Sequence, residues 1–259
     1  VNNAVAFTPT STTTYTVTGT DANGCSNTAQ ATVTVNAVPI VSAGNQTVCA
    51  GTAVTLSGSG ATTYAWNNSV INAVAFTPLS TTTYTVTGTD ANGCSNTAQA
   101  TVTVNAAPSV SAGGNQTVCA GTAVTLIGSG ATTYVWNNNV NNAVAFTPTS
   151  TATYTVTGTN AFGCSGTSQV TVVLLSIPSV SAGSNQTVCA GTAVTLSGSG
   201  ATTYAWNNGV SNAVAFTPTV TTIYTVTGTA ANGCSNTAQA TITVNAAPSV
   251  SAGINQTVC

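Results

Sequence analysis

The sequence predicts an all-β protein in which small two-sheet domains follow one another along the chain. Three observations lead to this prediction. The same sequence returns about every 70 residues, Thr- and Val-rich segments alternate apolar with polar residues, and no segment shows the 3.6-residue period of a helix. Alternation with a period of two places successive side chains on opposite faces of a β-strand.

The repeat is clearest in NQTVCAGTAVTL, which occupies residues 115–126 and recurs at 45–56 and 185–196. A unit of about 70 residues is too long for one rung of a solenoid and fits a small independent domain. We therefore expect domains arranged like beads on a string, in a segment of a longer array. The expected boundaries are a partial repeat at 1–37, complete repeats at 38–106, 107–176 and 177–246, and the start of a further repeat at 247–259. The three complete repeats are called first, second and third below.

Within the second repeat, short alternating segments are bounded by Gly, Asn and Pro, as strands are. A turn with Gly at its end, Asn160–Gly163 here and Asp90–Gly93 in the first repeat, lies before the last segment and fits a hairpin loop. Six or seven strands with one Trp and one Cys pair indicate an immunoglobulin-like β-sandwich. The expected strands lie in residues 122–128, 132–138, 142–148, 153–159 and 165–175. The expected core aromatic residues are Trp66, Trp136, Trp206, Tyr84, Tyr154 and Tyr224.

Composition excludes several classes of function. The chain has no Lys, Arg or His and only two carboxylates, Asp21 and Asp90. Acid–base catalysis lacks most of its usual groups, and a nucleic-acid partner lacks the cations that bind phosphates. The longest apolar run, Val170–Leu175, is far short of the roughly 18 residues of a membrane helix. We expect no enzyme activity, no catalytic or metal-binding residue, no cofactor, and no membrane insertion of this segment.

The eight cysteines predict structural disulfides and therefore an extracellular or cell-surface location. Without His or a C-x-x-C pair, metal binding is disfavoured. The favoured pairing lies within each repeat, because it makes each repeat a self-contained unit, and it leaves Cys25 and Cys259 unpaired within the chain. The alternative pairs neighbours across each linker. The favoured pairs are Cys49–Cys94, Cys119–Cys164 and Cys189–Cys234, and the alternative pairs are Cys25–Cys49, Cys94–Cys119, Cys164–Cys189 and Cys234–Cys259.

Four motifs carry a resemblance to a known family: V-C-x-G-x-x-V-x-L, Tyr-x-Trp, Y-T-V-T-G-T-D and the N-G-C turn. Together they resemble the PKD-like or immunoglobulin-like repeats found in tandem in giant secreted adhesins and gliding-type surface proteins of Bacteroidota. The resemblance covers the whole chain and implies export, a stalk or adhesive role, and no enzyme activity. PKD repeats carry an acidic segment after the Trp, whereas Asn67 and Asn68 follow Trp66 here, so no metal-binding role is carried over.

The expected function is that of a structural segment in an extracellular bacterial fibre, filament or adhesin stalk that is stiff and disulfide-bonded. Because the chain lacks the charges that usually protect sheet edges, we also expect association with copies of the same array. The alternative is an adhesive module. It would recognise a surface glycan or another cell through the loops after each Trp, which vary between copies around Ser69, Asn139 and Gly209.

Overall fold

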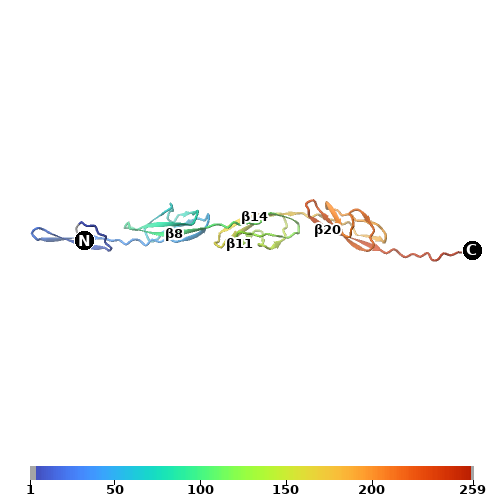
Figure 1. The fold of residues 1–259 in the computed structure, drawn as a ribbon, viewed down its shortest axis with the longest axis horizontal. Helices are drawn as coiled ribbons and strands as arrows, with labels where there is room; N and C mark the ends of the chain where they lie inside the picture. The colour runs from blue at the N-terminus through green and yellow to red at the C-terminus, as the bar shows by residue number, and fades with distance from the viewer. Residues whose placement is uncertain (1–3, 258–259) are drawn as a thin grey trace. The chain divides into compact units, whose positions relative to one another are not determined.

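The computed structural model describes residues 4–257, and every regular element in that range is a β-strand (Figure 1). Each complete repeat contains one four-stranded sheet and one two-stranded sheet, so the predicted all-β fold of repeated β-sandwiches is confirmed. The partial repeat contributes a single hairpin. The longest strand of each complete repeat, labelled β8, β14 and β20 in Figure 1, has 11 residues.

The strands lie as follows. The partial repeat has β1 (Thr13–Thr20) and β2 (Ser26–Val33). The first repeat has β3 (Gln46–Cys49), β4 (Val54–Thr55), β5 (Thr63–Trp66), β6 (Ala75–Phe76), β7 (Thr82–Thr89) and β8 (Ser95–Asn105). The second has β9 (Gln116–Cys119), β10 (Val124–Thr125), β11 (Thr133–Trp136), β12 (Ala145–Phe146), β13 (Ala152–Thr159) and β14 (Ser165–Leu175). The third has β15 (Gln186–Cys189), β16 (Val194–Thr195), β17 (Thr203–Trp206), β18 (Ala215–Phe216), β19 (Thr222–Thr229) and β20 (Ser235–Asn245).

Strand order is the same in all three repeats. In the first repeat the larger sheet runs β3-β8-β7-β5 and the smaller sheet pairs β4 with β6. The pairing of β8 with β7 is antiparallel, but its pairing with β3 is parallel, with Cys49 opposite Asn105. The last residue of β3 therefore lies beside the last residue of β8, while the turn between β7 and β8 lies at the other end of β8.

The core of each repeat lies between its two sheets. Residues of β7 alternate between buried and less buried positions, as the period of two predicts. Val86 has no exposed surface, Leu56 is 1% exposed, and Phe76 packs edge-to-face on Tyr84 with ring centroids 5.3 Å apart. The six aromatic residues expected in the core are all buried: Trp66, Trp136, Trp206, Tyr84, Tyr154 and Tyr224.

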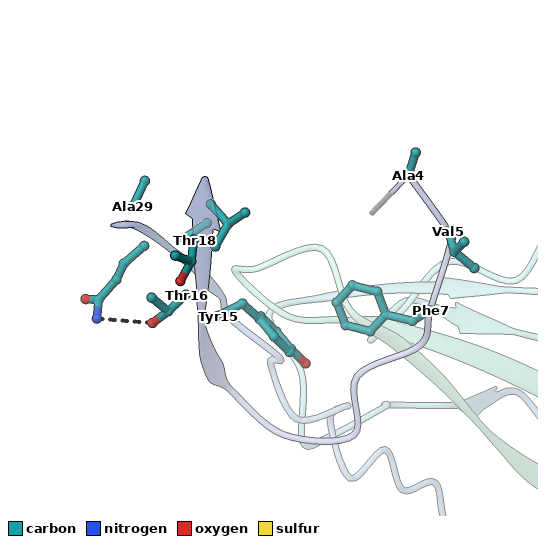
Figure 2. Close-up of a pocket in the computed structure, with 10 residues that line it drawn as sticks. Ala4, Val5, Phe7, Tyr15, Thr16, Thr18 and Ala29 are labelled. Atoms are coloured by element: carbon teal, nitrogen blue, oxygen red, sulfur yellow. Dashed lines mark hydrogen bonds between the residues drawn. The ribbon is translucent and has the colours of Figure 1, made fainter. Parts of the chain in front are cut away.

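The partial repeat has only one layer. Val17 of β1 is 64% exposed, whereas the equivalent Val86 is completely buried. Phe7 and Tyr15 pack edge-to-face, 5.0 Å between ring centroids, beside an open hollow (Figure 2). The hollow is the core-facing side of a sandwich half, because the described residues of this repeat form no counterpart of β3, β4 and β5.

The chain divides into two compact units whose boundaries differ from those of the repeats. One unit contains the residues up to Pro108 together with Thr159–Gly166, and the other contains Ser109–Gly158 together with the residues from Thr167 onward. The loop between β13 and β14 of the second repeat is thus grouped with the first repeat. The repeat boundaries at residues 38–106, 107–176 and 177–246 therefore stay a prediction.

Candidate functional site: disulfide bridges between repeats

One disulfide joins the first repeat to the second, and another joins the second repeat to the third. Cys49 bonds Cys164 and Cys119 bonds Cys234, and both pairs are separated by 115 residues. Their Cα atoms are 5.5 and 5.7 Å apart, in the usual range for a disulfide. In each pair, one cysteine ends the first strand of a repeat and is called the strand-end cysteine. The other precedes the last strand of the next repeat and is called the hairpin cysteine.

This connectivity corrects both predicted pairings. The favoured pair Cys49–Cys94 is wrong because the two residues lie at opposite ends of β8. Cys49 is opposite Asn105 at one end, and Cys94 precedes Ser95 at the other. Eleven residues of strand at about 3.3 Å each separate these ends by roughly 36 Å, far beyond disulfide range. The other favoured pairs, Cys119–Cys164 and Cys189–Cys234, and the alternative pairs Cys25–Cys49, Cys94–Cys119, Cys164–Cys189 and Cys234–Cys259 fail because Cys49, Cys119, Cys164 and Cys234 are bonded otherwise.

Three cysteines within residues 4–257 carry free thiols: Cys25, Cys94 and Cys189. Cys25 was expected to lack a partner in the chain, whereas Cys94 and Cys189 were expected to be bonded. Cys259, also expected to be unpaired, lies outside the described residues.

The end of β3 is fixed by backbone hydrogen bonds. The N–H of Ala50 donates to the carbonyl of Asn105, 2.9 Å away, and the N–H of Thr52 donates to the carbonyl of Cys49, 3.0 Å away. Gly51 has a φ of +84°, which suits the tight turn that follows. These contacts turn the chain away from the sheet directly after the cysteine, so its position at the end of β8 is well defined.

The hairpin cysteine is held by a side chain of its own loop. In the first repeat, Asp90 Oδ1 accepts hydrogen bonds from the N–H groups of Asn92 and Cys94, both 2.9 Å away. Asp21 makes the same contacts in the partial repeat. Both carboxylates are thus used by the turn, which is a frequent role of Asp.

In the two bonded hairpins an amide side chain also reaches the preceding linker. Asn160 Oδ1 accepts from the N–H of Cys164, while its Nδ2 donates to the carbonyl of Ala106, each at 3.0 Å. In the third repeat Asn232 does the same, accepting from Cys234 and donating to Ser176. A carboxylate only accepts hydrogen bonds. An amide is therefore suited to hold both the cysteine and the linker.

Sequence reasoning missed one structural residue in the loop after each Trp. Asn142 Oδ1 accepts hydrogen bonds from the indole N–H of Trp136 at 3.0 Å and from the N–H of Gly128 at 2.7 Å. Asn72 and Asn212 make the same two contacts in the other complete repeats. The available signal was an Asn that recurs six residues after every Trp. This part of the loop supports the core.

Replacing Asn142 with Ala should destabilise the second repeat by about 2–4 kcal/mol, because two donors lose their acceptor next to the core. Asn142→Asp keeps an acceptor and should cost less. Denaturant unfolding measures both effects. The matched control is Asn141→Ala, since Asn141 is exposed and only its backbone carbonyl is engaged. Equal losses for the two Ala variants would contradict this role for Asn142.

Residues 4–257 contain neither a metal-ligand cluster nor a membrane-spanning helix. This range contains no cluster of three or more His, Cys, Asp or Glu side chains placed to hold a metal ion. None of its elements is a helix long and apolar enough to cross a membrane.

No protein-family model and no curated protein matches the chain. The solved structures to which it is similar include the following three arrays. The I9–I11 tandem of titin has 14% identity and a TM-score of 0.36, covering 80% of this chain and 100% of that one. A Ca²⁺-stabilised ice-binding adhesin of an Antarctic bacterium has 15% identity and a TM-score of 0.33, covering 91% and 82%. Immunoglobulin domains 1–5 of Sidekick-1 have 16% identity and a TM-score of 0.29, covering 94% and 68%.

Proposed function

We propose that this chain is a structural segment of an extracellular bacterial fibre or adhesin stalk, in which covalent bonds between successive repeats resist extension. The observation that carries the proposal is the pair of disulfides Cys49–Cys164 and Cys119–Cys234, each joining one repeat to the next. A chain under tension gains directly from such bonds, because they limit the length of backbone that unfolding can release.

The redox chemistry supports an extracellular location. Disulfides persist in oxidising compartments and are rare in the cytosol. Closing a loop of 115 residues stabilises the folded state by up to about 5 kcal/mol in the chain-entropy model. Small domains of about 70 residues otherwise have a narrow margin of stability.

The uncharged surface supports association between copies. Exposed threonines on neighbouring strands hydrogen-bond each other, as Thr83 does with Thr101 at 3.0 Å and Thr153 with Thr171 at 3.1 Å. The edge strand β11 has no charged residue, and its Val135 is 70% exposed. Sheet edges without charges pair readily with other strands. A second copy of the array is therefore the partner that this surface favours.

The alternative function, glycan recognition by the loops after each Trp, has less support. In the second repeat, Asn142 supports Trp136, and Asn137 Oδ1 accepts from the N–H of Thr155 at 2.9 Å. These two amides are engaged within the fold, which leaves fewer groups of this loop available to a sugar. We therefore expect no glycan binding by a complete repeat.

Sedimentation of the purified, oxidised chain tests the association. The wild type should associate as its concentration rises, and Val135→Lys should weaken the association because it places a charge on the edge of the sheet. Thr149→Lys, in the loop before β13, changes the net charge equally and serves as the control. A wild type that stays monomeric at all concentrations would contradict self-association, and specific binding on a glycan array would favour the adhesive alternative.

A further inference from the structure

The free thiols of Cys94 and Cys189 lie in the same positions as cysteines that are bonded elsewhere in the chain. Cys189 ends β15 opposite Asn245, as Cys49 ends β3 opposite Asn105. The following residue, Ala190, donates to the carbonyl of Asn245 at 2.8 Å, which matches the contact of Ala50. Cys189 is therefore a strand-end cysteine with the same local backbone structure as the two that form disulfides.

Cys94 corresponds in the same way to Cys164. Each directly follows a positive-φ glycine, Gly93 or Gly163, and the N–H of each donates to the side chain four residues earlier. Cys94 is thus a hairpin cysteine. Cys189 is exposed and Cys94 is half-buried, so both thiols are open to reaction.

From these matches we infer that the two observed disulfides belong to a continuous series in which every strand-end cysteine bonds the hairpin cysteine of the following repeat. The partner of Cys189 is then a hairpin cysteine in a following copy of the repeat, 115 residues further along a continuous array, as for the two observed bonds. The partner of Cys94 is a strand-end cysteine in a preceding copy. This inference rests on the proposed structural function and names the covalent partner of the array.

The series requires an oxidant, and the chemistry is thiol–disulfide exchange. Two thiols lose two protons and two electrons when they form one disulfide. A disulfide donor such as oxidised glutathione accepts them and is reduced to two thiols. The chain has no Lys, Arg or His that would favour a catalytic thiolate or complete a metal site, so cross-linking is the reaction that suits these cysteines best.

The mechanical consequence is a short covalent path along the array. After the disulfide at Cys164, the next strand-end cysteine, Cys189, follows only 25 residues later. A path that alternates one disulfide with 25 residues of backbone advances by two repeats, for which the backbone alone uses 140 residues. Fully extended, 25 residues span about 85 Å. An array with every cysteine bonded would therefore lengthen far less under force than one without these bonds, even after its sandwiches unfold.

The test uses a longer chain in which further repeats follow the last one without a change in the spacing of the repeats. Residues 50–259 are appended directly after Cys259, because the sequence ending at Cys259 repeats the sequence ending at Cys49. Cys189 of the appended copy is replaced by Ser, so that the extended chain contains a single Cys189. After folding with oxidised glutathione, free thiols are alkylated and the disulfides are mapped by mass spectrometry. Cys189 should be protected from alkylation and bonded to Cys94 of the appended copy.

Two matched variants identify the partner. Cys94→Ser in the appended copy should leave Cys189 alkylated, whereas Cys94→Ser in the first copy should not. In the original 259-residue chain, Cys189 should be alkylated as long as the chain is monomeric. If it is instead bonded to Cys94 of a second molecule in a disulfide-linked dimer, the following repeat comes from that molecule and the inference is supported, whereas a Cys189–Cys189 dimer would contradict it.

Alkylation of Cys189 in the extended chain, or a bond from Cys189 to Cys234, would overturn the inference. If Cys49–Cys164 and Cys119–Cys234 still form in that case, only the continuous series fails and the proposed function stands. If all thiols of a folded, oxidised chain are alkylated, the proposed function fails as well.

Discussion

A single oxidised chain pulled from its two ends should extend by far less than its backbone allows. Between Cys49 and Cys234 there are 185 residues of backbone, but the two disulfides provide a shorter route through the 45 residues from Cys164 back to Cys119. At about 3.5 Å per residue these routes span roughly 650 Å and roughly 160 Å. Reduction of the disulfides should therefore release about 140 residues of additional length, which single-molecule force spectroscopy measures.

Two single variants distinguish this connectivity from bonds within each repeat. Cys119→Ser removes one disulfide and leaves the 70 residues from Cys164 to Cys234 as the shortest route, a gain of 25 residues. Cys94→Ser removes a free thiol and should change nothing. If Cys94→Ser instead lengthened the oxidised chain by about 160 Å, Cys94 would be bonded within its own repeat.

Leu126→Ala should unfold the second repeat or bring it close to unfolding. Leu126 is 1% exposed and lies in the same core cluster as Trp136 and Val156. Truncating a buried Leu to Ala costs about 3–5 kcal/mol, which is comparable with the whole stability that a core of this size provides. Hydrogen exchange should show loss of protection in β13 and β14, and unchanged protection in β7 and β8.

The neighbouring residue provides the control. Ile127 is 58% exposed, and Ile127→Ala removes a similar amount of side chain from the surface, so it should cost well under 1 kcal/mol. If both substitutions cost the same, the two-sheet packing described for this repeat is wrong. Simultaneous loss of protection in β7 and β8 would show that the repeats do not unfold separately.

The repeat and the fold class were predictable from the sequence because both depend on local patterns. Alternation in residues such as Tyr154, Thr155 and Val156 assigns one face of a strand to the core without any knowledge of topology. Turn residues mark the ends of the strands in the same way. Trp136 was placed in the core because a single large apolar residue in a small sandwich has few other places to lie.

The disulfides were not predictable in the same way because their pairing depends on strand direction. Spacing alone makes Cys49 and Cys94 look like a pair within one domain. The parallel pairing of β3 with β8 places Cys49 at the far end of the sheet, beside Asn105. Period-two alternation reveals which face a residue occupies but not which way a strand runs. Asn142 was missed for a related reason, since its hydrogen bonds depend on how a loop folds back over Trp136.

Disulfide mapping of the oxidised 259-residue chain tests the central claim most directly. Trypsin has no site in a chain without Lys or Arg, but chymotrypsin cleaves after the aromatic residues and Leu. One of its fragments, 163–174, contains Cys164 alone. The structure predicts that this fragment is joined to fragment 16–56, which contains Cys25 and Cys49, and tandem mass spectrometry should place the bond at Cys49. Joining to fragment 85–126, which contains Cys94 and Cys119, would contradict the account, and a bond at Cys119 would lie within one repeat.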